Sequence, residues 1–270
     1  MSNRSLIIQC TNSCPCICPG CYNFFSTGQI SSEDIDIFIA EYNKRFGLSK
    51  VTLSGGDPLL REDLTVIINK ICDRKIPITI DTVGTVFLNE IDHKLLLSLK
   101  KISYLGLPID GIKDQTIQQF RNNSTFEQCM KIVKRSQEIV PAICINTVVH
   151  SKNLNEILDI ATIVNNNPSI FKWQLFQFMP IGPGGFANKS LYSISNTEFE
   201  NLECALKGIS FRDSLKVECK SIENRKNKYL ILGCDGVLWL PQMGPNRKII
   251  GNVFENDIFD RLKCLNNEDL

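Results

Sequence analysis

Short apolar runs alternate with segments of helical spacing over the first two thirds of the chain. The runs predict strands at residues 5–10, 50–53, 77–81, 102–107, 142–149 and 171–178. Apolar positions three or four residues apart predict helices between them, at residues 32–46, 61–74, 90–99, 125–140 and 153–164. This alternation is typical of α/β proteins with a parallel sheet covered by helices, either open or closed into a barrel. Six such units are fewer than the eight of a complete barrel.

The pattern changes after residue 182. A Gly/Pro-rich link, IGPGGFANKS, leads to a predicted helix at about residues 196–207 and to strands at 215–218, 228–232 and 236–240. The run YLILGCDGVLWLPQ predicts a hairpin with its turn at Cys234, Asp235 and Gly236. We therefore expect two parts, a strand-and-helix domain over residues 1–182 and a C-terminal extension over residues 183–270. Apolar residues of the extension, among them Phe186, Trp239 and Leu240, are expected to cap the first part.

Composition narrows the class of protein. A length of 270 residues easily buries a core. The net charge is +1, and Lys and Arg are spread along the chain, so we find no nucleic-acid or membrane footprint. The apolar part of MSNRSLIIQC is too short for a signal peptide, and no run approaches transmembrane length. Twelve cysteines without an export signal indicate a reducing compartment, so we expect a cytoplasmic location.

Three cysteines with the spacing C-x3-C-x2-C follow the first predicted strand. Cys14, Cys18 and Cys21 lie in the run CPCICPGCYN. Three thiolates can hold three irons of a [4Fe–4S] cluster, and the fourth iron then keeps an open position that can bind a small molecule. A zinc site would need a fourth thiolate, from Cys10 or Cys16, and no second Cys-x2-Cys pair follows. A disulfide scaffold, or burial of the cysteines as small apolar residues, would also account for them.

This loop resembles the signature loop of the radical S-adenosylmethionine (radical SAM) superfamily, including the aromatic Tyr22 after the third cysteine. The resemblance implies a partial (β/α)6 TIM-like barrel with a C-terminal capping extension. It also implies a [4Fe–4S] cluster bound by the three cysteines, whose open iron binds S-adenosylmethionine. The reduced cluster then cleaves S-adenosylmethionine to methionine and a 5′-deoxyadenosyl radical, which abstracts hydrogen from the substrate. A flavodoxin or ferredoxin is the implied electron donor.

Further motifs follow the other predicted strands, where parallel α/β folds gather their chemistry. LSGGDPLL resembles the GGEP motif of the superfamily, so Gly55, Gly56, Asp57 and Pro58 are expected to bind S-adenosylmethionine, although Asp57 replaces the usual Glu. The run after the third strand departs from the T-N-G of many relatives. Four more residues resemble cofactor-binding positions of the superfamily: Tyr22, Asp110, Arg121 and Met179. Arg121 is equally well explained as a solvated surface charge.

Three further polar residues are candidates by position. Asn146 and Gln177 lie within apolar runs, and we expect them to face the barrel interior as cofactor-binding residues, although each alternatively satisfies a backbone group. His150 ends the fifth predicted strand, so we assign it a catalytic role in contact with substrate or a proton. His93, the other histidine, is expected to be structural.

The substrate stays open at this point. The runs KWQLFQF and NKYLIL resemble viperin, a nucleotide-modifying member, and favour a nucleotide-like small molecule. The stretch RNNSTFEQ resembles peptide-modifying members, and the end of the chain resembles SPASM-type extensions. Because the extension has no Cys-x2-Cys pair, we expect no auxiliary cluster. CPGCYN also resembles the corresponding loop of activases of glycyl-radical enzymes. If the chain is not an enzyme, the alternative is a non-catalytic zinc or iron–sulfur protein.

Overall fold

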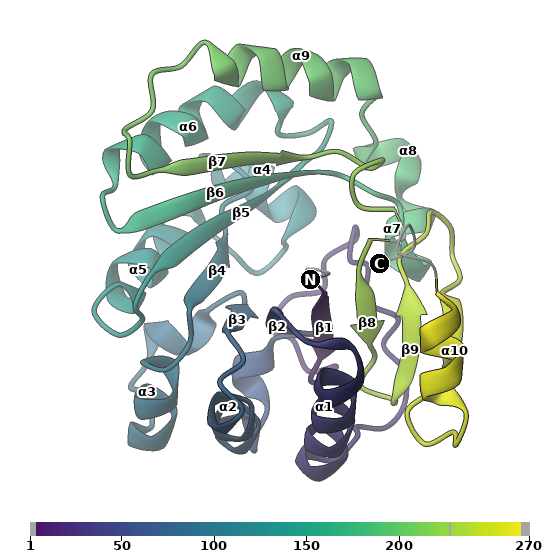
Figure 1. Ribbon diagram of the computed structural model, residues 1–270. Coiled ribbons are helices and arrows are strands. Elements are labelled where there is room, and N and C mark those ends of the chain that lie inside the picture. The colour runs from purple at the N-terminus through teal and green to yellow at the C-terminus, as the bar shows by residue number, and fades with distance from the viewer. Residues whose placement is uncertain (1–3, 227, 266–270) are drawn as a thin grey trace.

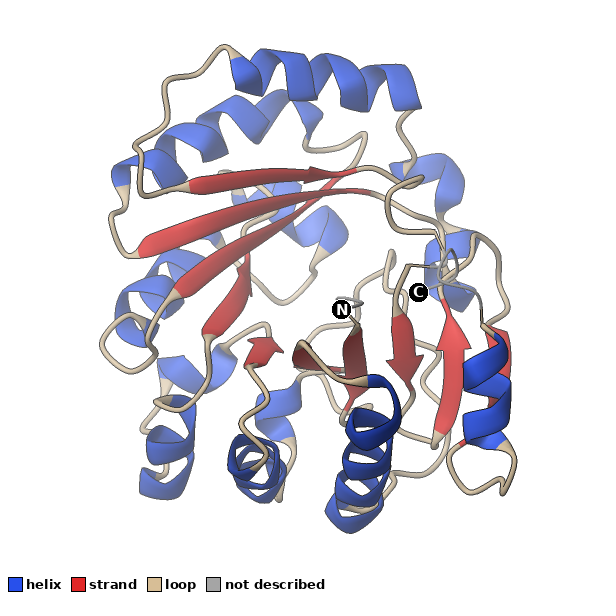
Figure 2. Ribbon diagram, viewed as in Figure 1, coloured by secondary structure: helices blue, strands red, loops and turns tan. Residues whose placement is uncertain are grey.

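The strands form one curved sheet with helices on its outer side (Figures 1 and 2). The structure is a computed structural model that describes residues 4–226 and 228–265. In this part of the chain the sheet has ten strands in the order β10-β9-β8-β1-β2-β3-β4-β5-β6-β7. The first six pair in parallel, in sequence order, and are β1 (Ser5–Gln9), β2 (Lys50–Ser54), β3 (Ile78–Asp81), β4 (Tyr104–Pro108), β5 (Ile143–Val149) and β6 (Ile170–Gln177).

Helices connect successive strands and cover the outside of the sheet (Figure 2). They are α1 (Ser32–Phe46), α2 (Leu64–Asp73), α3 (His93–Leu99), α4 (Asp114–Phe120), α5 (Phe126–Ser136) and α6 (Ile157–Asn166), with short 3-10 helices η1 (Pro58–Leu60), η2 (Thr85–Leu88) and η3 (Leu154–Glu156). The sequence sets α1 sharply at both ends. The Ser31 hydroxyl caps it by accepting the Asp34 N–H at 3.0 Å, and Gly47 ends it with φ +74°.

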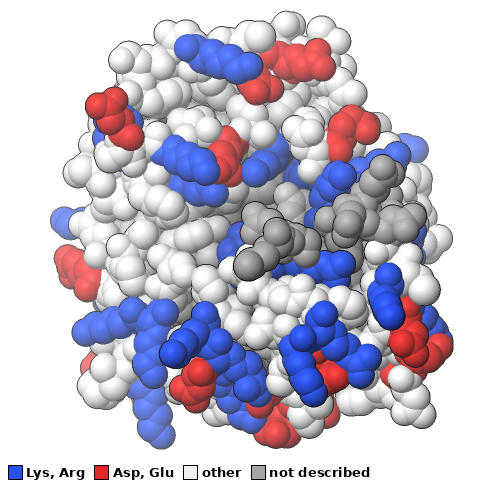
Figure 3. All heavy atoms as spheres, viewed as in Figure 1, with Lys and Arg blue, Asp and Glu red and all other residues white. Residues whose placement is uncertain are grey.

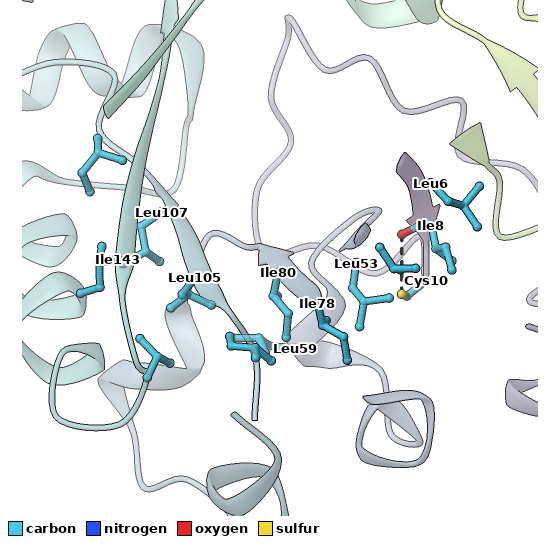
Figure 4. Close-up of a cluster of buried hydrophobic side chains, with 14 of the residues drawn as sticks. Leu6, Ile8, Cys10, Leu53, Leu59, Ile78, Ile80, Leu105, Leu107 and Ile143 are labelled. Carbon is cyan, nitrogen blue, oxygen red and sulfur yellow. Dashed lines mark hydrogen bonds between the residues drawn. The ribbon is translucent and has the colours of Figure 1, made fainter. Parts of the chain in front are cut away.

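Alternate residues of each strand face opposite sides of the sheet. The helix-facing side chains are apolar and almost fully buried. Figure 4 labels nine of them, together with Leu59 of η1: Leu6, Ile8, Cys10, Leu53, Ile78, Ile80, Leu105, Leu107 and Ile143. The residues between them face the barrel interior. Many are polar and only half-buried, among them Lys50, Asp81, Asn146, Lys172 and Gln174. The interior is therefore a polar surface, and the apolar core lies between the sheet and the helices.

The C-terminal part continues the same sheet at both sides. After α7 (Gly182–Ala187), α8 (Lys189–Tyr192) and α9 (Asn196–Lys207) come β7 (Lys216–Lys220), β8 (Leu230–Leu232), β9 (Val237–Leu240), β10 (Lys248–Asn252) and α10 (Ile258–Cys264). β7 pairs in parallel with β6, whereas β8 pairs in parallel with β1 at the other side. The predicted hairpin is present as β8–β9, with Gly236 at φ +80°.

The partial (β/α)6 barrel is confirmed, and the extension does more than cap it. Its strands complete the hydrogen bonding of β1 and β6, so the boundary that we placed at residue 182 divides a continuous sheet. Trp239 is fully buried and meets the ring of Phe24 edge-on at 5.2 Å, beside Met179 and Ile181. No helix of the described residues is long and apolar enough to cross a membrane.

Candidate functional site

The loop between β1 and α1, residues 10–31, carries the three motif cysteines at the C-terminal end of the first strand. Cys14, Cys18 and Cys21 are partly exposed and none forms a disulfide. Cys10 is fully buried and burial raises its thiol pKa to about 12, while Cys16 is 4% exposed and lies 3.9 Å from the Ser124 hydroxyl. The three motif thiols are therefore the accessible ones of this loop, called the cysteine loop below.

One arginine holds the base of the cysteine loop together. Arg61 donates to the carbonyl oxygen of Cys10 at 2.6 Å and to that of Ile30 at 2.9 Å, which are the two ends of the loop. Its guanidinium also pairs with Asp63, at 2.5 Å from Nε. The residue is 5% exposed. Arg61 was not predicted from the sequence, because an arginine after a GGDP motif gives no signal of contacts with residues as far back as Cys10 and Ile30.

Two asparagines next to Arg121 fix the tip of the cysteine loop. Asn122 accepts the N–H of Ile17 at 2.9 Å, and Asn123 donates to the carbonyl oxygen of Pro15 at 2.6 Å. Asn188, beyond α7, donates to the carbonyl oxygen of Pro19 at 3.0 Å. These residues were not predicted, although the polar run RNNS after a helix is a signal of such loop contacts.

Gly55 and Gly56 bring the end of β2 against the backbone of the cysteine loop. The Gly56 N–H donates to the Thr11 carbonyl at 2.6 Å, and the Asp57 N–H donates to the Ser13 carbonyl at 2.7 Å. Gly55 has φ +131°, and a Cβ there would lie 2.6 Å from the Thr11 oxygen. The glycines are thus required for a close approach of two backbones, whether or not they also contact S-adenosylmethionine.

Asp57 is the buried cap of the turn that follows. Its Oδ1 accepts the Leu59 N–H at 3.1 Å and the hydroxyl of Thr82, at the end of β3. Burial raises the pKa of this carboxyl, and the Thr82 hydroxyl opposes the shift. Pro58 begins η1 directly after it, where a fixed φ and a missing N–H suit the first turn. Asp57 therefore joins the ends of β2 and β3, and its predicted contact with S-adenosylmethionine stays a prediction.

Arg121 and Asp110 form an ion pair beside Cys18. Arg121 donates to Oδ2 of Asp110 through Nη2 at 2.8 Å and Nε at 3.2 Å, and its Nη1 lies 3.8 Å from the Cys18 sulfur. Oδ1 of Asp110 accepts the Val148 N–H at 2.8 Å. Burial lowers the pKa of Arg121, but the Asp110 carboxylate and the Cys18 thiol outweigh it and raise that pKa. The side chain of Arg121 is 15% exposed, so it is not a solvated surface charge.

Tyr22, the residue after the third motif cysteine, extends from the cysteine loop to the end of β2. Its hydroxyl is 3.1 Å from that of Ser54, and burial raises its pKa to about 12. Gln9 is next to it, and its buried side-chain amide interacts with the Tyr22 hydroxyl. Met179 and Tyr22 belong to one apolar cluster with Trp239. This cluster forms a floor on one side of the loop.

Asn146 faces the barrel interior as expected, and Gln177 does not. Asn146 Nδ2 donates to Asp81 Oδ1 at 2.9 Å across β4. Gln177 donates to Asn196 Oδ1 at 3.0 Å and accepts the Ile222 N–H at 3.0 Å, so it ties α9 and the segment after β7 to the far side of β6. The reason is the alternation of strand faces, which points Gln174 into the interior instead.

His150 lies in an aromatic cluster behind the rim. It is fully buried, stacked on Phe120 at 4.5 Å, and meets Tyr192 edge-on at 5.5 Å. Nδ1 accepts the Lys152 N–H at 3.2 Å, and burial lowers the pKa of the imidazole to about 4. This placement favours a packing role, and the catalytic role assigned from the sequence stays a prediction.

The residues at this rim fit an iron–sulfur cluster with a bound small molecule. Three free thiols on one loop supply soft ligands, and Arg121 supplies a positive charge beside them. The buried amide oxygen of Asn12 lacks a partner in the described chain, so a polar group remains for a ligand. Among residues 4–226 and 228–265, no three Cys, His, Asp or Glu side chains converge to hold a single metal ion.

A parallel α/β barrel with three accessible motif thiols on the loop after its first strand defines a class of iron–sulfur enzymes. Residues 8–164, more than half of the chain, match the family described as the Radical SAM superfamily. The chain therefore belongs to the radical SAM superfamily. It is an enzyme that uses a [4Fe–4S] cluster and S-adenosylmethionine, and such enzymes need an electron donor and a substrate.

Curated relatives and solved structures agree with this assignment. A Methanocaldococcus jannaschii protein named "Probable GTP 3′,8-cyclase" is 26% identical over 237 residues, which cover 86% of this chain and 74% of the relative. The GTP 3′,8-cyclase of Clostridium perfringens is 25% identical over 203 residues, and the chain spans only 59% of its length. Streptococcus suis SuiB bound to its precursor peptide SuiA superposes with a TM-score of 0.77 at 15% identity, over 96% of this chain and 64% of SuiB. The structure described as "Native anSMEcpe with bound AdoMet and Cp18Cys peptide" gives 0.70 at 17% identity, over 98% and 81%.

Proposed function

We propose that the enzyme abstracts a hydrogen atom from a nucleotide-like small molecule held in the barrel interior. The observation that carries this proposal is the polar interior face below the cysteine loop, where Asp81, Asn146 and Gln174 are half-buried and close together. A core-forming sheet face would be apolar, so these side chains are suited to hydrogen-bond a polar ligand. The GTP 3′,8-cyclase names of two relatives support a nucleotide as the ligand.

The chain's residues have separate tasks in this proposal. The bound cluster and S-adenosylmethionine supply the hydrogen-abstracting 5′-deoxyadenosyl radical. Cys14, Cys18 and Cys21 hold the cluster, while Asp110 keeps the Arg121 guanidinium beside Cys18, where its fork suits the methionine carboxylate. The apolar floor with Tyr22 excludes water from the space under the cysteine loop.

The electron donor is proposed to dock on the outer face of the cysteine loop. Ile17, between Cys16 and Cys18, is 78% exposed and is held outward by the Asn122 contact to its N–H. An exposed apolar residue directly beside a cluster ligand suits a small, transient electron-transfer interface. A flavodoxin or ferredoxin is the proposed partner.

The test is anaerobic reconstitution followed by reaction with S-adenosylmethionine, dithionite and perdeuterated nucleotides. We expect 5′-deoxyadenosine that carries deuterium from one nucleotide, measured by mass spectrometry. The matched control is the protein with Cys14, Cys18 and Cys21 replaced by Ala, which should form none. Deuterium transfer from a ribosomally made peptide, or formation of a glycyl radical on a partner enzyme, in place of transfer from nucleotides would overturn the proposed substrate class.

A further inference from the structure

Glu218 on β7 is surrounded by lysine side chains. Its Oε2 lies 3.1 Å from Lys172 Nζ on β6 and 3.0 Å from Lys220 Nζ, and its Oε1 lies 2.8 Å from Lys216 Nζ. Gln174 Nε2 also donates to it at 3.0 Å. The side chains of Lys172, Glu218 and Lys220 are 14%, 17% and 30% exposed and form a half-buried cluster, whereas Lys216, at 68%, reaches Glu218 from the surface.

Lys50 on β2 joins the cluster from across the interior. Its Nζ and that of Lys172 each lie 6.0 Å from the ring centroid of Tyr104. Burial lowers the pKa of Lys50, the charges of Lys172 and Lys220 lower it further, and Asp81 opposes them. The ammonium groups of Lys50, Lys172 and Lys220 therefore lie close enough to repel one another in the barrel interior.

The carboxylates in this space do not balance its lysines. Burial raises the pKa of Glu218, but the bonds to its three lysines outweigh this and hold that pKa below its usual value. Glu218 is thus a charged carboxylate. Asp81 is the other acidic side chain, and burial raises its pKa, which favours its neutral form. At most two charged carboxylates, those of Glu218 and Asp81, therefore lie near the ammonium groups of Lys50, Lys172, Lys216 and Lys220, and Figure 3 shows Lys and Arg side chains gathered around a recess on this face of the molecule.

We propose that Lys50, Lys172 and Lys220 bind the phosphoryl groups of the substrate, and that Glu218 is the internal counter-ion of this site, which the substrate displaces. This inference rests on the proposed function and names the charged end of its substrate. A phosphoryl chain carries more charge than one carboxylate and offers more acceptor oxygens, so it can replace Glu218 at Lys172 and Lys220 and also pair with Lys50.

The position along the strands fits an elongated small molecule. Lys50 is the first residue of β2, whereas the glycines that touch the cysteine loop directly follow this strand. Five strand residues span about 17 Å at roughly 3.3 Å each. The charged end of the ligand would lie at the lysines, and its reacting carbon would lie under the cysteine loop.

Glu218 then sets the selectivity of the site. A ligand with a single negative charge gains little by replacing the carboxylate, because the number of ion pairs stays the same. A polyphosphate gains additional pairs with Lys50, which Glu218 does not contact in the described structure. The site should therefore favour di- and triphosphates over inorganic phosphate or single carboxylates.

The test is calorimetric titration of the anaerobically reconstituted full chain with inorganic triphosphate, pyrophosphate and phosphate, without S-adenosylmethionine. We expect triphosphate to bind most tightly and its affinity to fall with ionic strength. Lys172→Gln and Lys220→Gln should each weaken triphosphate binding by about tenfold. Glu218→Gln should strengthen it, because the counter-ion is removed while the side-chain shape stays. Lys207→Gln, with its side chain 71% exposed on α9, is the control and should bind as the parent protein does.

Several outcomes would overturn this site. They are an absence of triphosphate binding, lysine variants that bind like the parent, a weaker Glu218→Gln variant, or tighter binding of an acidic peptide than of triphosphate. Melting curves of each variant identify a folding defect. If a Gln variant does not fold, Lys172→Glu takes its place and should also weaken triphosphate binding. Because these titrations require no radical chemistry, their failure is distinguishable from failure of deuterium transfer, which tests the proposed function.

Discussion

Gly56 lies so close to Ser13 that a Cβ on the glycine would be 2.2 Å from the Ser13 carbonyl oxygen. Real Cβ atoms do not approach backbone oxygens this closely, so any side chain at position 56 must displace the cysteine loop. The GGDP motif and the cluster motif are therefore one structural unit. From the sequence alone, substitution of Gly56 is expected to weaken cofactor binding while iron content stays near that of the parent protein.

The structure changes that expectation. Gly56→Ala should lower both the iron content and the binding of S-adenosylmethionine, because the ligand loop moves. The measurements are iron and sulfide per chain after anaerobic reconstitution, and equilibrium binding of S-adenosylmethionine. Gly185→Ala is the matched control, since its Cβ would meet its nearest atom at an ordinary 3.5 Å. Full iron content in Gly56→Ala would show that the cysteine loop can move to accept the Cβ without losing the cluster.

The cluster ligands give a second prediction. Replacement of Cys14, Cys18 and Cys21 together by Ala should abolish the cluster and all cleavage of S-adenosylmethionine. Cys16→Ala should retain both, because a fourth thiolate would close the iron that must stay open, although the Cys16 thiol contacts those of Cys14 and Cys18 as well as the Ser124 hydroxyl. Iron analysis and 5′-deoxyadenosine formation measure the two effects. A cluster that survives without Cys18 but not without Cys16 means that our ligand assignment is wrong.

The Asp110–Arg121 pair predicts a loss of stability when one partner is removed. Asp110→Asn leaves the Arg121 guanidinium without its counter-ion in a nearly buried position, which should lower the free energy of unfolding by about 3 kcal/mol. Urea denaturation of the apoprotein measures this. Glu41→Gln removes an exposed partner of Arg45 within α1 and should cause no measurable change. Equal stabilities of the two variants would contradict the importance that we give to the rim pair.

His150 predicts a pH dependence of stability. Its pKa is lowered by burial from 6.5 to about 4, so between these values the unfolded chain binds more protons than the folded one. The contribution of His150 to the free energy of unfolding is fully present above pH 6.5 and is lost as the pH falls toward 4. The loss is about 3 kcal/mol at most, at 1.36 kcal/mol per pKa unit.

His150→Phe keeps an aromatic ring in contact with Phe120 and should remove this part of the pH dependence. Denaturation curves between pH 4 and pH 7 on the parent protein and the variant measure it. His93→Phe, at the exposed start of α3, tests whether the change is specific to position 150. An unchanged slope in His150→Phe shows that other groups cause the acid sensitivity.

The extension provides the last prediction. A chain that ends at residue 185 lacks β7 and β8, which pair with β6 and β1, and lacks the buried Trp239. The truncated chain should therefore not unfold cooperatively on heating. If the extension were only a separate cap, the same truncation would leave a soluble fragment that still binds the cluster. Trp239→Ala should lower the free energy of unfolding by about 3–5 kcal/mol. Cooperative melting of the truncated chain would restore residue 182 as a domain boundary.

Much of the barrel was predictable because its signals are local. The apolar spacing of α1, with Ser31 before it and Gly47 after it, predicts the observed bounds, and α9 was equally well marked by Ser195. The short α4 was missed, since its N-cap residue Lys113 makes no side-chain cap. β10 was missed because only Gly251 of its five residues is fully buried and it continues the sheet only through pairing with β9.

The site was predictable where one motif carries the chemistry and not where distant segments meet. The spacing of the motif cysteines is visible in one run of letters. The contact of Arg61 with both ends of the cysteine loop, and the meeting of Lys50, Lys172 and Glu218, depend on strand register across the sheet. Gln177 was placed on the wrong face because one polar residue in an apolar run does not reveal which face is buried.

The pairing of β1 with β8 constrains how this enzyme is made. β1 precedes the cysteine loop, and one of its two neighbours in the sheet, β8, begins at Leu230. During synthesis the first strand therefore stays half-paired until β8 has left the ribosome, and non-local parallel pairing of this kind is slow. Until then the thiols of the cysteine loop follow a strand that lacks one of its two neighbours. Iron and sulfide delivery should thus follow synthesis of β8, and the unloaded polypeptide is the species that oxygen meets first.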